Sequence, residues 1–309
     1  MITRRRLGLA APALLGMATL SPRPARSAED WRKQFPTIVF GTVTGENAGD
    51  RVKRYKPAED YLSRTLGVKI GWAEATDYAG IIQGIISKKI QLAHFGPASF
   101  SKTWILSHGQ VVPVAEMLDQ YGNHGYYSVT LVRKDSPYNT IADLKGKTYA
   151  FADPNSTSGF QAPSYFLTKD GYPPQSFFGK TMFSGSHENS VMALYHKDVD
   201  AVSTWWNNDT LSNPALMAKK GMIPAGWWKV IWKSPLLPSD PWAMPTWLPQ
   251  QMRDDVTKAV LDMPKNGKEA FAVVSSGLST GFAPGNLDDY KPIIDLVQYN
   301  AEHHVGETG

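Results

Sequence analysis

The residues best suited to chemistry lie in one short stretch, 153–160. Its polar centre is a run of three hydroxyl residues and a glycine: Ser156, Thr157, Ser158 and Gly159. A strand pattern at 148–152 leads into the stretch, and a helical pattern at 159–169 follows it. A helix start offers unpaired N–H groups and the positive end of the helix dipole, so this run predicts a site for a small tetrahedral oxyanion. The alternative is a simple helix N-cap, which accounts for one hydroxyl but not for three.

Two further candidates lie at the starts of other predicted helices. Asp77 caps a helical pattern over 77–86 whose apolar residues recur at helical spacing, and this places Tyr78 on the first turn. Tyr78 is therefore either a ligand contact or a core aromatic residue. His187 follows a Gly-Ser pair at another helix start. Its imidazole can donate to an oxyanion, or it can serve as a capping or packed ring.

An acidic residue and a pair of tryptophans complete the set of candidates. Asp240, which lies among serine and proline residues, is either a turn residue or a ligand acceptor. A carboxylate beside a bound oxyanion requires a proton donor on the ligand, such as P–OH or ammonium, because two negative charges would otherwise meet in a dry cleft. Trp205 and Trp206 point to opposite faces of an extended segment, so we expect at most one to line a site.

The composition excludes several kinds of chemistry. The chain contains no cysteine, which rules out thiol catalysis and cysteine-based zinc sites. His303 and His304 are adjacent, but no third ligand lies in range of this pair, so we expect no metal site. We also expect no cofactor.

The first part of the chain alternates strand and helix patterns. The predicted strands are 38–43, 68–72, 90–95 and 111–115. The first helix between them has Pro57 in its first turn. This order predicts a parallel sheet with helices on both faces. Ligand sites in such sheets lie at the carboxyl ends of the strands, which here are the loops 44–47, 76–78 and 95–99.

The second half predicts another sheet, formed by 148–151, 180–183 and 199–202. Two isolated extended segments, 126–133 and 230–241, predict a two-segment hinge that joins two α/β lobes around a ligand cleft. Lobe 1 is then 29–129 plus 242–309, and lobe 2 is 130–241. From Pro249 onward the pattern is helical to the end.

The first 28 residues have the pattern of an export signal. Arginines at 4–6 precede an apolar run at 7–20 and then small residues. The run is shorter than the about 20 residues that span a bilayer. The adjacent arginines indicate the twin-arginine route, with cleavage near Ser27 or Ala28 and a periplasmic protein as product. This segment holds five of the 32 basic residues and no acidic one, so the remainder is nearly neutral and gives no reason to expect nucleic acid.

Several segments together show a family resemblance. The most specific are Asp-Tyr-Ala-Gly-Ile-Ile-Gln-Gly at 77–84 and the octet at 153–160. Supporting segments are Gly-Tyr-Tyr-Ser-Val at 125–129, Gly-Ser-His-Glu at 185–188 and the stretch 230–241. In these segments the chain resembles the periplasmic phosphonate-binding proteins of ABC importers (PhnD type), part of a wider phosphate, phosphite and phosphonate group.

The resemblance implies a type II periplasmic binding protein fold, a monomeric binding protein without enzyme activity, and an ABC importer permease as its partner. It implies that the phosphonate oxygens are held by Tyr78, Ser156, Thr157 and Ser158. His187 would also donate to the ligand, and Asp240 would match the carboxylate in the family's cleft.

Two positions depart from the family pattern. Phe95 stands where relatives have a tyrosine, so one donor would be missing. Asn207 stands roughly where members that take aminoalkylphosphonates have an acid, and Trp205 makes that wall bulkier. Loss of a carboxylate weakens the hold on an ammonium group by about 1.5–3 kcal/mol. We therefore expect a smaller or uncharged-tail ligand such as phosphite or methylphosphonate.

Three rival functions remain open at this point. An exported phosphoester hydrolase would need an activated nucleophile or a metal cluster, and Ser158 has no Gly-x-Ser-x-Gly frame around it. A sensor subunit with the same fold would present its ligand to a membrane receptor. The same fold could also bind another cargo, such as a sulfonate or a thiamine precursor.

Overall fold

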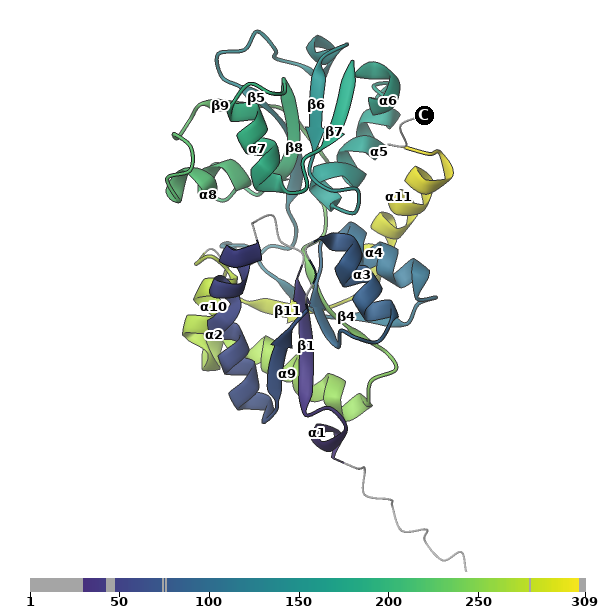
Figure 1. Ribbon diagram of the computed structural model, residues 1–309, viewed down its shortest axis with the longest axis vertical. Helices are drawn as coiled ribbons and strands as arrows, with labels where there is room; N and C mark the ends of the chain where they lie inside the picture. Colours follow the sequence, from purple (N-terminus) through teal and green to yellow (C-terminus); the bar gives the residue numbers. More distant parts are fainter. Residues whose placement is uncertain (1–29, 43–47, 74, 76, 278, 306–309) are drawn as a thin grey trace, which may run out of the picture.

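Two β-sheets, one above the other in Figure 1, form the frame of the molecule, and each carries helices on both faces. The computed structural model describes residues 30–42, 48–73, 75, 77–277 and 279–305. The predicted export signal and the predicted loop 44–47 lie outside the described residues. Alternation along a strand explains the two covered faces: in β1 (Thr37–Thr42), Phe40 packs into one apolar cluster and Val39 packs against another.

The first sheet has six strands in the order β11-β4-β10-β3-β1-β2. After β1 they are β2 (Lys69–Trp72), β3 (Leu92–His94), β4 (Val111–Met117), β10 (Pro241–Pro245) and β11 (Phe282–Pro284). β1 is parallel to β2 and β3, but β10 inserts antiparallel between β3 and β4, and β11 pairs antiparallel with β4. The four predicted strands β1, β2, β3 and β4 thus run in one direction, as expected. The sheet as a whole is mixed, because the strand that returns from the second lobe pairs inside it and β11 pairs at its edge.

Helices cover the first sheet in two groups, one on each face. They are α2 (Ala48–Leu66), α9 (Gln250–Asn266) and α10 (Lys268–Val274) on one face, and α3 (Tyr78–Ile86) and α4 (Pro97–Leu106) on the other. α3 begins as the sequence predicts, with Asp77 Oδ1 accepting from Gly80 N at 2.8 Å. Two expectations are wrong. Pro57 lies inside α2, because this helix already begins at Ala48, and β11 interrupts the helical pattern after Pro249.

The second sheet has five strands in the order β7-β6-β8-β5-β9. They are β5 (Tyr127–Arg133), β6 (Thr148–Phe151), β7 (Lys180–Phe183), β8 (Ala201–Trp206) and β9 (Trp228–Lys233). β6, β7 and β8 are parallel, whereas β5 runs antiparallel to both β8 and β9. Its helical segments are η1 (Ile141–Leu144), α5 (Ala162–Lys169), α6 (Pro174–Phe177), α7 (His187–Tyr195) and α8 (Asn213–Lys219).

The chain passes between the two sheets at 118–126 and 234–240. The sequence predicts longer hinge segments, at 126–133 and 230–241. These bounds are wrong, because β5 and β9 contain most of these residues and belong to the second sheet. The second sheet also begins at Tyr127, slightly before the predicted start of lobe 2. We use lobe 1 and lobe 2 below for the parts built on the first and second sheets.

The two crossing segments are bonded to each other. Tyr126 and Leu237 exchange backbone hydrogen bonds of 3.0 and 2.8 Å. Gly125 has φ 102°, and a Cβ at this position would lie 2.3 Å from the Leu237 carbonyl oxygen. The close approach of the two segments therefore requires glycine here.

Helix α11 (Lys291–Glu302), which follows η3 (Leu287–Tyr290), lies along the side of the molecule against both lobes (Figure 1). Its apolar face shares one cluster with α4 of lobe 1 and α5 of lobe 2: Ala98, Ala162, Ile293, Leu296 and Val297. Asn300 Nδ2 donates to the Gln161 backbone oxygen at 2.9 Å. The C-terminal helix thus connects the lobes a third time, in addition to the two crossings.

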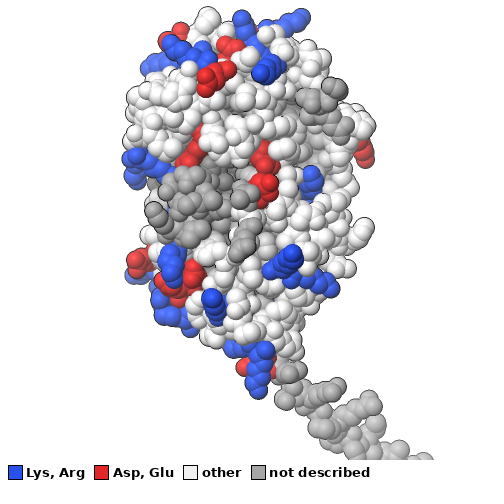
Figure 2. Space-filling view, viewed as in Figure 1, with Lys and Arg blue, Asp and Glu red and all other residues white. Residues whose placement is uncertain are grey.

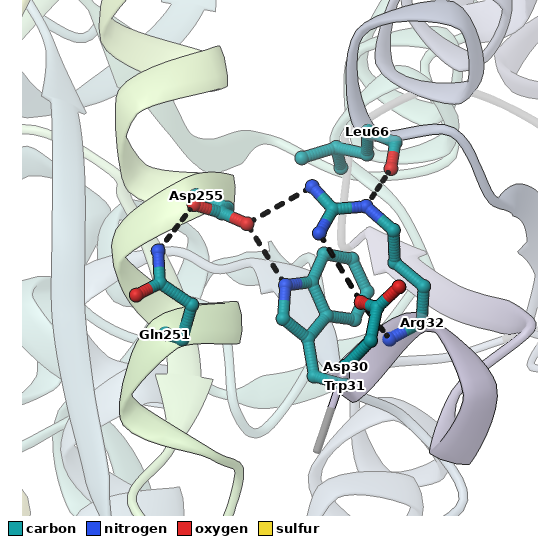
Figure 3. Close-up of polar contacts among 6 residues, drawn as sticks. All are labelled: Asp30, Trp31, Arg32, Leu66, Gln251 and Asp255. Carbon is teal, nitrogen blue, oxygen red and sulfur yellow. Dashed lines mark hydrogen bonds and ion pairs between the residues drawn. The ribbon is translucent and has the colours of Figure 1, made fainter. Parts of the chain in front are cut away.

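The first described helix, α1 (Trp31–Gln34), is fastened to the far end of lobe 1 (Figure 3). Trp31 Nε1 donates to Asp255 Oδ2 at 2.8 Å, and the Arg32 guanidinium contacts the same oxygen at 3.0 Å. Arg32 Nε also donates to the Leu66 carbonyl oxygen at 2.8 Å. These bonds hold the start of the described chain away from the space between the lobes.

Charges of both signs are interspersed on the face shown in Figure 2, and acidic side chains lie near the boundary between the lobes. Carboxylates at that boundary would repel an oxyanion. These surface carboxylates therefore give the predicted oxyanion no attraction on this face. None of the helices described is long and apolar enough to span a bilayer.

Candidate ligand-binding site

A cavity of about 550 Å³ lies between the lobes, at the carboxyl ends of strands from both sheets. The sequence-predicted residues that line it are Tyr78, Ser156, Thr157, Ser158, His187, Trp205, Asn207 and Asp240. Phe95 does not line it. Its side chain is fully buried in a lobe 1 cluster, next to Phe100. Position 95, at which the sequence analysis expects a hydrogen-bond donor to be lost, therefore lies in the core. His94, one residue earlier on β3, lines the cavity instead.

The hydroxyl run sits where β6 turns into a helix. A π-helical turn, η2 (Thr157–Gln161), leads directly into α5, and Ser156 is its N-cap. Ser156 Oγ accepts from Gly159 N at 3.1 Å. A Cβ on Gly159 would lie 2.5 Å from Ala152 Cβ and 2.8 Å from Ser156 Oγ. Glycine is therefore required for the turn to close this tightly around the serine.

The other two hydroxyl residues connect the turn to its surroundings. Thr157 Oγ1 accepts from the backbone N–H of Ala98 at 2.8 Å, and Ala98 lies at the start of α4 in lobe 1. Ser128 Oγ donates to the Ser158 carbonyl oxygen at 2.7 Å. The helix starts of η2 and α4 therefore meet across the cleft, and both direct positive dipole ends toward the cavity.

His187, at the first position of α7, contacts the Ser156 hydroxyl. Its Nε2 lies 3.0 Å from Ser156 Oγ, and its Nδ1 lies 3.1 Å from Thr204 Oγ1. Burial lowers the pKa of His187 to about 4, so the ring is neutral at neutral pH. Both ring nitrogens therefore have protein partners, and the ring fixes the orientation of the Ser156 hydroxyl.

Asp240 and Tyr126 come from the two crossing segments and meet at the cavity. Burial raises the pKa of Asp240 to about 7, and a hydrogen bond from Tyr126 opposes the shift. Asp240 Oδ1 has no hydrogen-bond partner among the described residues. Burial, together with the charge of Asp240, raises the pKa of Tyr126 well above its usual value. The tyrosine therefore remains a hydroxyl donor.

The remaining predicted residues form the edges of the cavity. Tyr78 is 8% exposed on the first turn of α3. Trp205 lines the cavity, whereas Trp206 packs against an apolar cluster of lobe 2, as expected for neighbours on a strand. Asn207 Nδ2 donates to the Gly125 carbonyl oxygen at 3.2 Å. This bond holds the cavity wall at Asn207 against the crossing segment 118–126.

The structure adds residues that the sequence interpretation did not place in the site. Tyr126 lines the cavity together with the hydroxyl run, and the side chains of Thr157 and Ser158 partly offset the rise in its pKa. Its signal is the Gly-Tyr-Tyr segment at 125–127, which overlaps the predicted hinge segment 126–133. On lobe 1, Tyr55 and His94 also line the cavity, with their Oη and Nδ1 atoms 3.2 Å apart. No local motif marks that pair.

No group of three or more potential metal ligands occurs among the described residues. His303 is exposed, and its Nδ1 lies 2.9 Å from the Tyr299 carbonyl oxygen. The arrangement that can do chemistry here is a set of neutral hydrogen-bond donors at two helix starts, with one carboxyl group that titrates near neutral pH. Such a set suits the binding of an oxyanion.

Comparisons with known proteins identify the family. Residues 40–290 match the family described as ABC transporter, phosphonate, periplasmic substrate-binding protein. The phosphonates-binding periplasmic protein of Escherichia coli is 36% identical over 75% of this chain and 66% of its own length. The phosphate-import protein PhnD of Mycolicibacterium smegmatis is 30% identical over 82% of this chain and 77% of its own length.

Solved structures show the same fold. A binding protein component of an ABC phosphonate transporter from Pseudomonas aeruginosa has a TM-score of 0.75 and 26% identity, over 89% of this chain and 90% of that one. A Prochlorococcus marinus protein in complex with methylphosphonate has a TM-score of 0.74 and 21% identity, over 86% and 99%. The protein has the type II periplasmic binding fold, and it belongs to the family of periplasmic substrate-binding proteins of ABC phosphonate transporters.

Proposed function

We propose that this chain captures a small phosphorus oxyanion, a phosphonate or phosphite, in the cavity between its lobes and delivers it to the permease of an ABC importer. The observation that carries the proposal is the run Ser156, Thr157 and Ser158 at a helix start, with Tyr78 and Tyr126 on the same cavity. Hydroxyl and N–H donors at a helix N-terminus fit a tetrahedral anion. The names of relatives that bind phosphonate, phosphite or phosphate support the same ligand class.

In the proposed complex the hydroxyl run donates to the ligand oxygens. Thr157 keeps its hydroxyl hydrogen for the ligand, because its oxygen accepts from Ala98 N. Ser156 does the same when His187 carries its ring hydrogen on Nε2, the tautomer that Thr204 favours by donating to Nδ1. His187 then acts as a positioning residue that keeps Ser156 a donor.

Asp240 makes the site sensitive to the protonation state of the ligand. Its pKa of about 7 reflects burial, so near neutral pH both forms of the carboxyl group are populated. A protonated Asp240 can donate to an oxyanion, and an ionised one can accept from a P–OH group. Either way one proton is shared between ligand and carboxyl group, which avoids facing negative charges in the cavity.

The transport role requires that the ligand be enclosed and presented. Closure of the lobes around the ligand would use the contact between Thr157 and Ala98, and the joined crossing segments would act as the hinge. We propose that the protein acts as a monomer in the periplasm. In this proposal residues 1–28 direct twin-arginine export and are removed near Ser27 or Ala28.

Titration calorimetry of the mature protein tests the proposal. The panel is phosphate, phosphite, methylphosphonate, 2-aminoethylphosphonate and sulfate. We expect phosphite or methylphosphonate to bind tightest, and the change Ser156→Ala, Thr157→Ala and Ser158→Ala together to weaken binding more than about 1000-fold, since three charge-assisted hydrogen bonds are lost. Tightest binding of sulfate, or of none of the panel, would contradict the proposal.

A matched control separates the site from general effects on folding. Ser164 is fully buried in α5, and its Oγ has no partner among the described residues. Ser164→Ala removes a hydroxyl from the same helical region but not from the cavity, so we expect wild-type affinity. Incubation with a chromogenic phosphate ester, with and without added metal ions, tests the hydrolase alternative, for which we expect no product.

A further inference from the structure

A row of polar side chains crosses three neighbouring strands of lobe 1 beside the cavity. Thr42 of β1 pairs in register with His94 of β3, and His94 pairs in register with Trp242 of β10. Directly opposed residues on adjacent strands project from the same face of a sheet. The rings of His94 and Trp242 are stacked, with centroids 5.7 Å apart. The three side chains therefore form one continuous polar row.

The row carries three polar atoms without partners. Thr42 Oγ1, His94 Nε2 and Trp242 Nε1 have no hydrogen-bond partner in the described part of the chain. These residues are only 3%, 8% and 0% exposed. Buried polar groups are normally hydrogen-bonded, and an orphaned group destabilises the fold. Three adjacent orphans make the row a candidate site for a ligand.

The cavity reaches this row at one of its three members. His94 lines it, together with Tyr55 of α2, whose hydroxyl lies 3.2 Å from His94 Nδ1. Burial and the nearby charge of Arg54 lower the pKa of His94 to about 3, so the ring is neutral. With the Tyr55 hydroxyl donating to Nδ1, the ring hydrogen lies on Nε2. His94, Trp242 and Thr42 then all present donors.

The size of the cavity also exceeds what the head group needs. Pockets of roughly 300–1,000 Å³ hold drug-sized molecules, and this one encloses about 550 Å³. A phosphite or methylphosphonate bound at the hydroxyl run would leave the lobe 1 side of the cavity unfilled. A ligand that uses both walls needs a phosphorus head and an organic substituent.

We propose that the row of Thr42, His94 and Trp242, which the cavity reaches at His94, is a second subsite that binds a carboxylate at the distal end of the substituent of a phosphonate. The inference rests on the proposed function, because the phosphonate head occupies the hydroxyl run. Donors that face an acceptor-only group explain why the row lacks protein partners. The positive charge of Arg54, felt at His94, favours an anionic group over an ammonium group at this end. The ligand class is thus a phosphonocarboxylate.

Paired ligands of equal chain length test the subsite. Phosphonoacetate, 3-phosphonopropionate and 4-phosphonobutyrate are compared by calorimetry with alkylphosphonates of matching length and with 2-aminoethylphosphonate. We expect at least one carboxylate to bind more than about tenfold tighter than its alkyl counterpart, the value of a charge-assisted hydrogen bond. Equal or tighter binding of the alkyl or amino compounds would overturn the subsite and leave the proposed function intact. No binding by any phosphonate or by phosphite would overturn both.

Variants test whether the residues of the row cause the preference for carboxylates over alkyl groups. Thr42→Val has nearly the same shape and removes only the hydroxyl, so the ratio of carboxylate to alkyl affinity should fall about fivefold or more, with methylphosphonate affinity unchanged. The unliganded variant should be no less stable than wild type, because an orphaned hydroxyl has been replaced by a methyl group. His94→Phe should reduce the same ratio. A preference that survives both changes would refute this assignment.

Thr168→Val provides the matched control. Thr168 Oγ1 in α5 is also without a partner among the described residues, but Thr168 belongs to lobe 2 and lies outside the row. The control should retain the full carboxylate preference. If it loses the preference as Thr42→Val does, the effect is not local to the row and the second subsite is refuted.

Discussion

The two walls of the cavity are built from similar residues but are bonded in opposite ways. On the lobe 2 wall, Ser156 and His187 are bonded to each other, and His187 is bonded to Thr204 behind them. On the lobe 1 wall, His94 has one nitrogen bonded to Tyr55 and the other without a partner in the described part of the chain. One wall is organised before any ligand arrives, whereas the other leaves its donors unpaired.

Both walls keep a buried histidine neutral, so charge does not distinguish them. Burial lowers the pKa of His187 to about 4 and that of His94, with help from Arg54, to about 3. The difference lies in what surrounds the ring. A helix start supplies N–H groups next to His187, while a strand row supplies only side chains next to His94. A preorganised wall suits the ligand group that all cargo shares, and an unpaired wall suits the group that distinguishes one cargo from another.

The largest effect is expected from Gly159→Ala, which disturbs the bonded arrangement of the lobe 2 wall. The new Cβ would lie 2.8 Å from Ser156 Oγ and 2.9 Å from His187 Cε1, so the serine must leave its position. We expect methylphosphonate affinity to fall about 1000-fold and the free energy of unfolding to fall by about 1–3 kcal/mol from overpacking. Calorimetry and denaturant unfolding measure the two quantities.

Gly71→Ala is the control for this change, on strand β2 of lobe 1. The nearest atom to a Cβ there is Thr37 Cγ2 at 3.4 Å, an ordinary contact distance, and Gly71 does not line the cavity. Affinity should remain at the wild-type value. Retention of tight binding by Gly159→Ala would show that the turn is not the preorganised element of the site.

The next effect concerns the carboxyl group between the walls. Because the pKa of Asp240 rises from 3.8 to about 7 on folding, the folded protein holds a proton that the unfolded chain releases, and stability falls as pH rises from about 4 to 7. Asp240→Asn removes this loss, so the variant should gain at most about 4 kcal/mol over wild type at pH 7 and above. Urea unfolding from pH 4 to 8 measures it. A variant less stable than wild type at pH 7 would contradict the raised pKa.

The lobe 2 wall could be predicted from the sequence because its signals are local. The hydroxyl run, Gly159 and the following helical pattern lie within a few residues of each other, and so do Asp77 and the apolar stripe of α3. Capping and helical periodicity are properties of neighbouring residues. Short-range physics therefore predicts the turn at the hydroxyl run and the position of Tyr78 on the first turn of α3.

The lobe 1 wall could not be predicted, because it depends on pairing between distant residues. Trp242 meets His94 only after β10 has returned from lobe 2 and inserted into the first sheet. Nor could the faces of β3 be distinguished, since Leu92, His94 and Phe95 are all buried and show no alternation of apolar and polar residues. The resemblance to the family points to Phe95, whereas His94 lines the cavity.

A smaller effect tests whether the histidine of the preorganised wall is neutral. The pKa of His187 falls from 6.5 to about 4 on folding, so the unfolded chain takes up a proton that the folded protein refuses, and stability is lost as pH falls from 6.5 toward 4. His187→Gln should remove at most about 3 kcal/mol of this loss. The measurement is best made in an Asp240→Asn background, because Asp240 contributes a slope of opposite sign in the same window. The exposed His303→Gln is the control, and an unchanged slope in His187→Gln would contradict neutrality.

The smallest effect concerns the contact that brings the two walls together. Lys102 Nζ of α4 donates to Asn155 Oδ1 of lobe 2 at 2.7 Å, next to the bond between Thr157 and Ala98. Lys102→Met removes a hydrogen bond that exists only when the lobes are close, so it should raise the ligand off-rate about threefold, as loss of one partly exposed bond allows, and leave the on-rate unchanged. Stopped-flow kinetics separate the two rates, with the exposed Lys89→Met as control. A lower on-rate at constant off-rate would mean that Lys102 attracts the anion rather than holding the closed lobes together. Lobe 1 would then attract the ligand before the two walls meet.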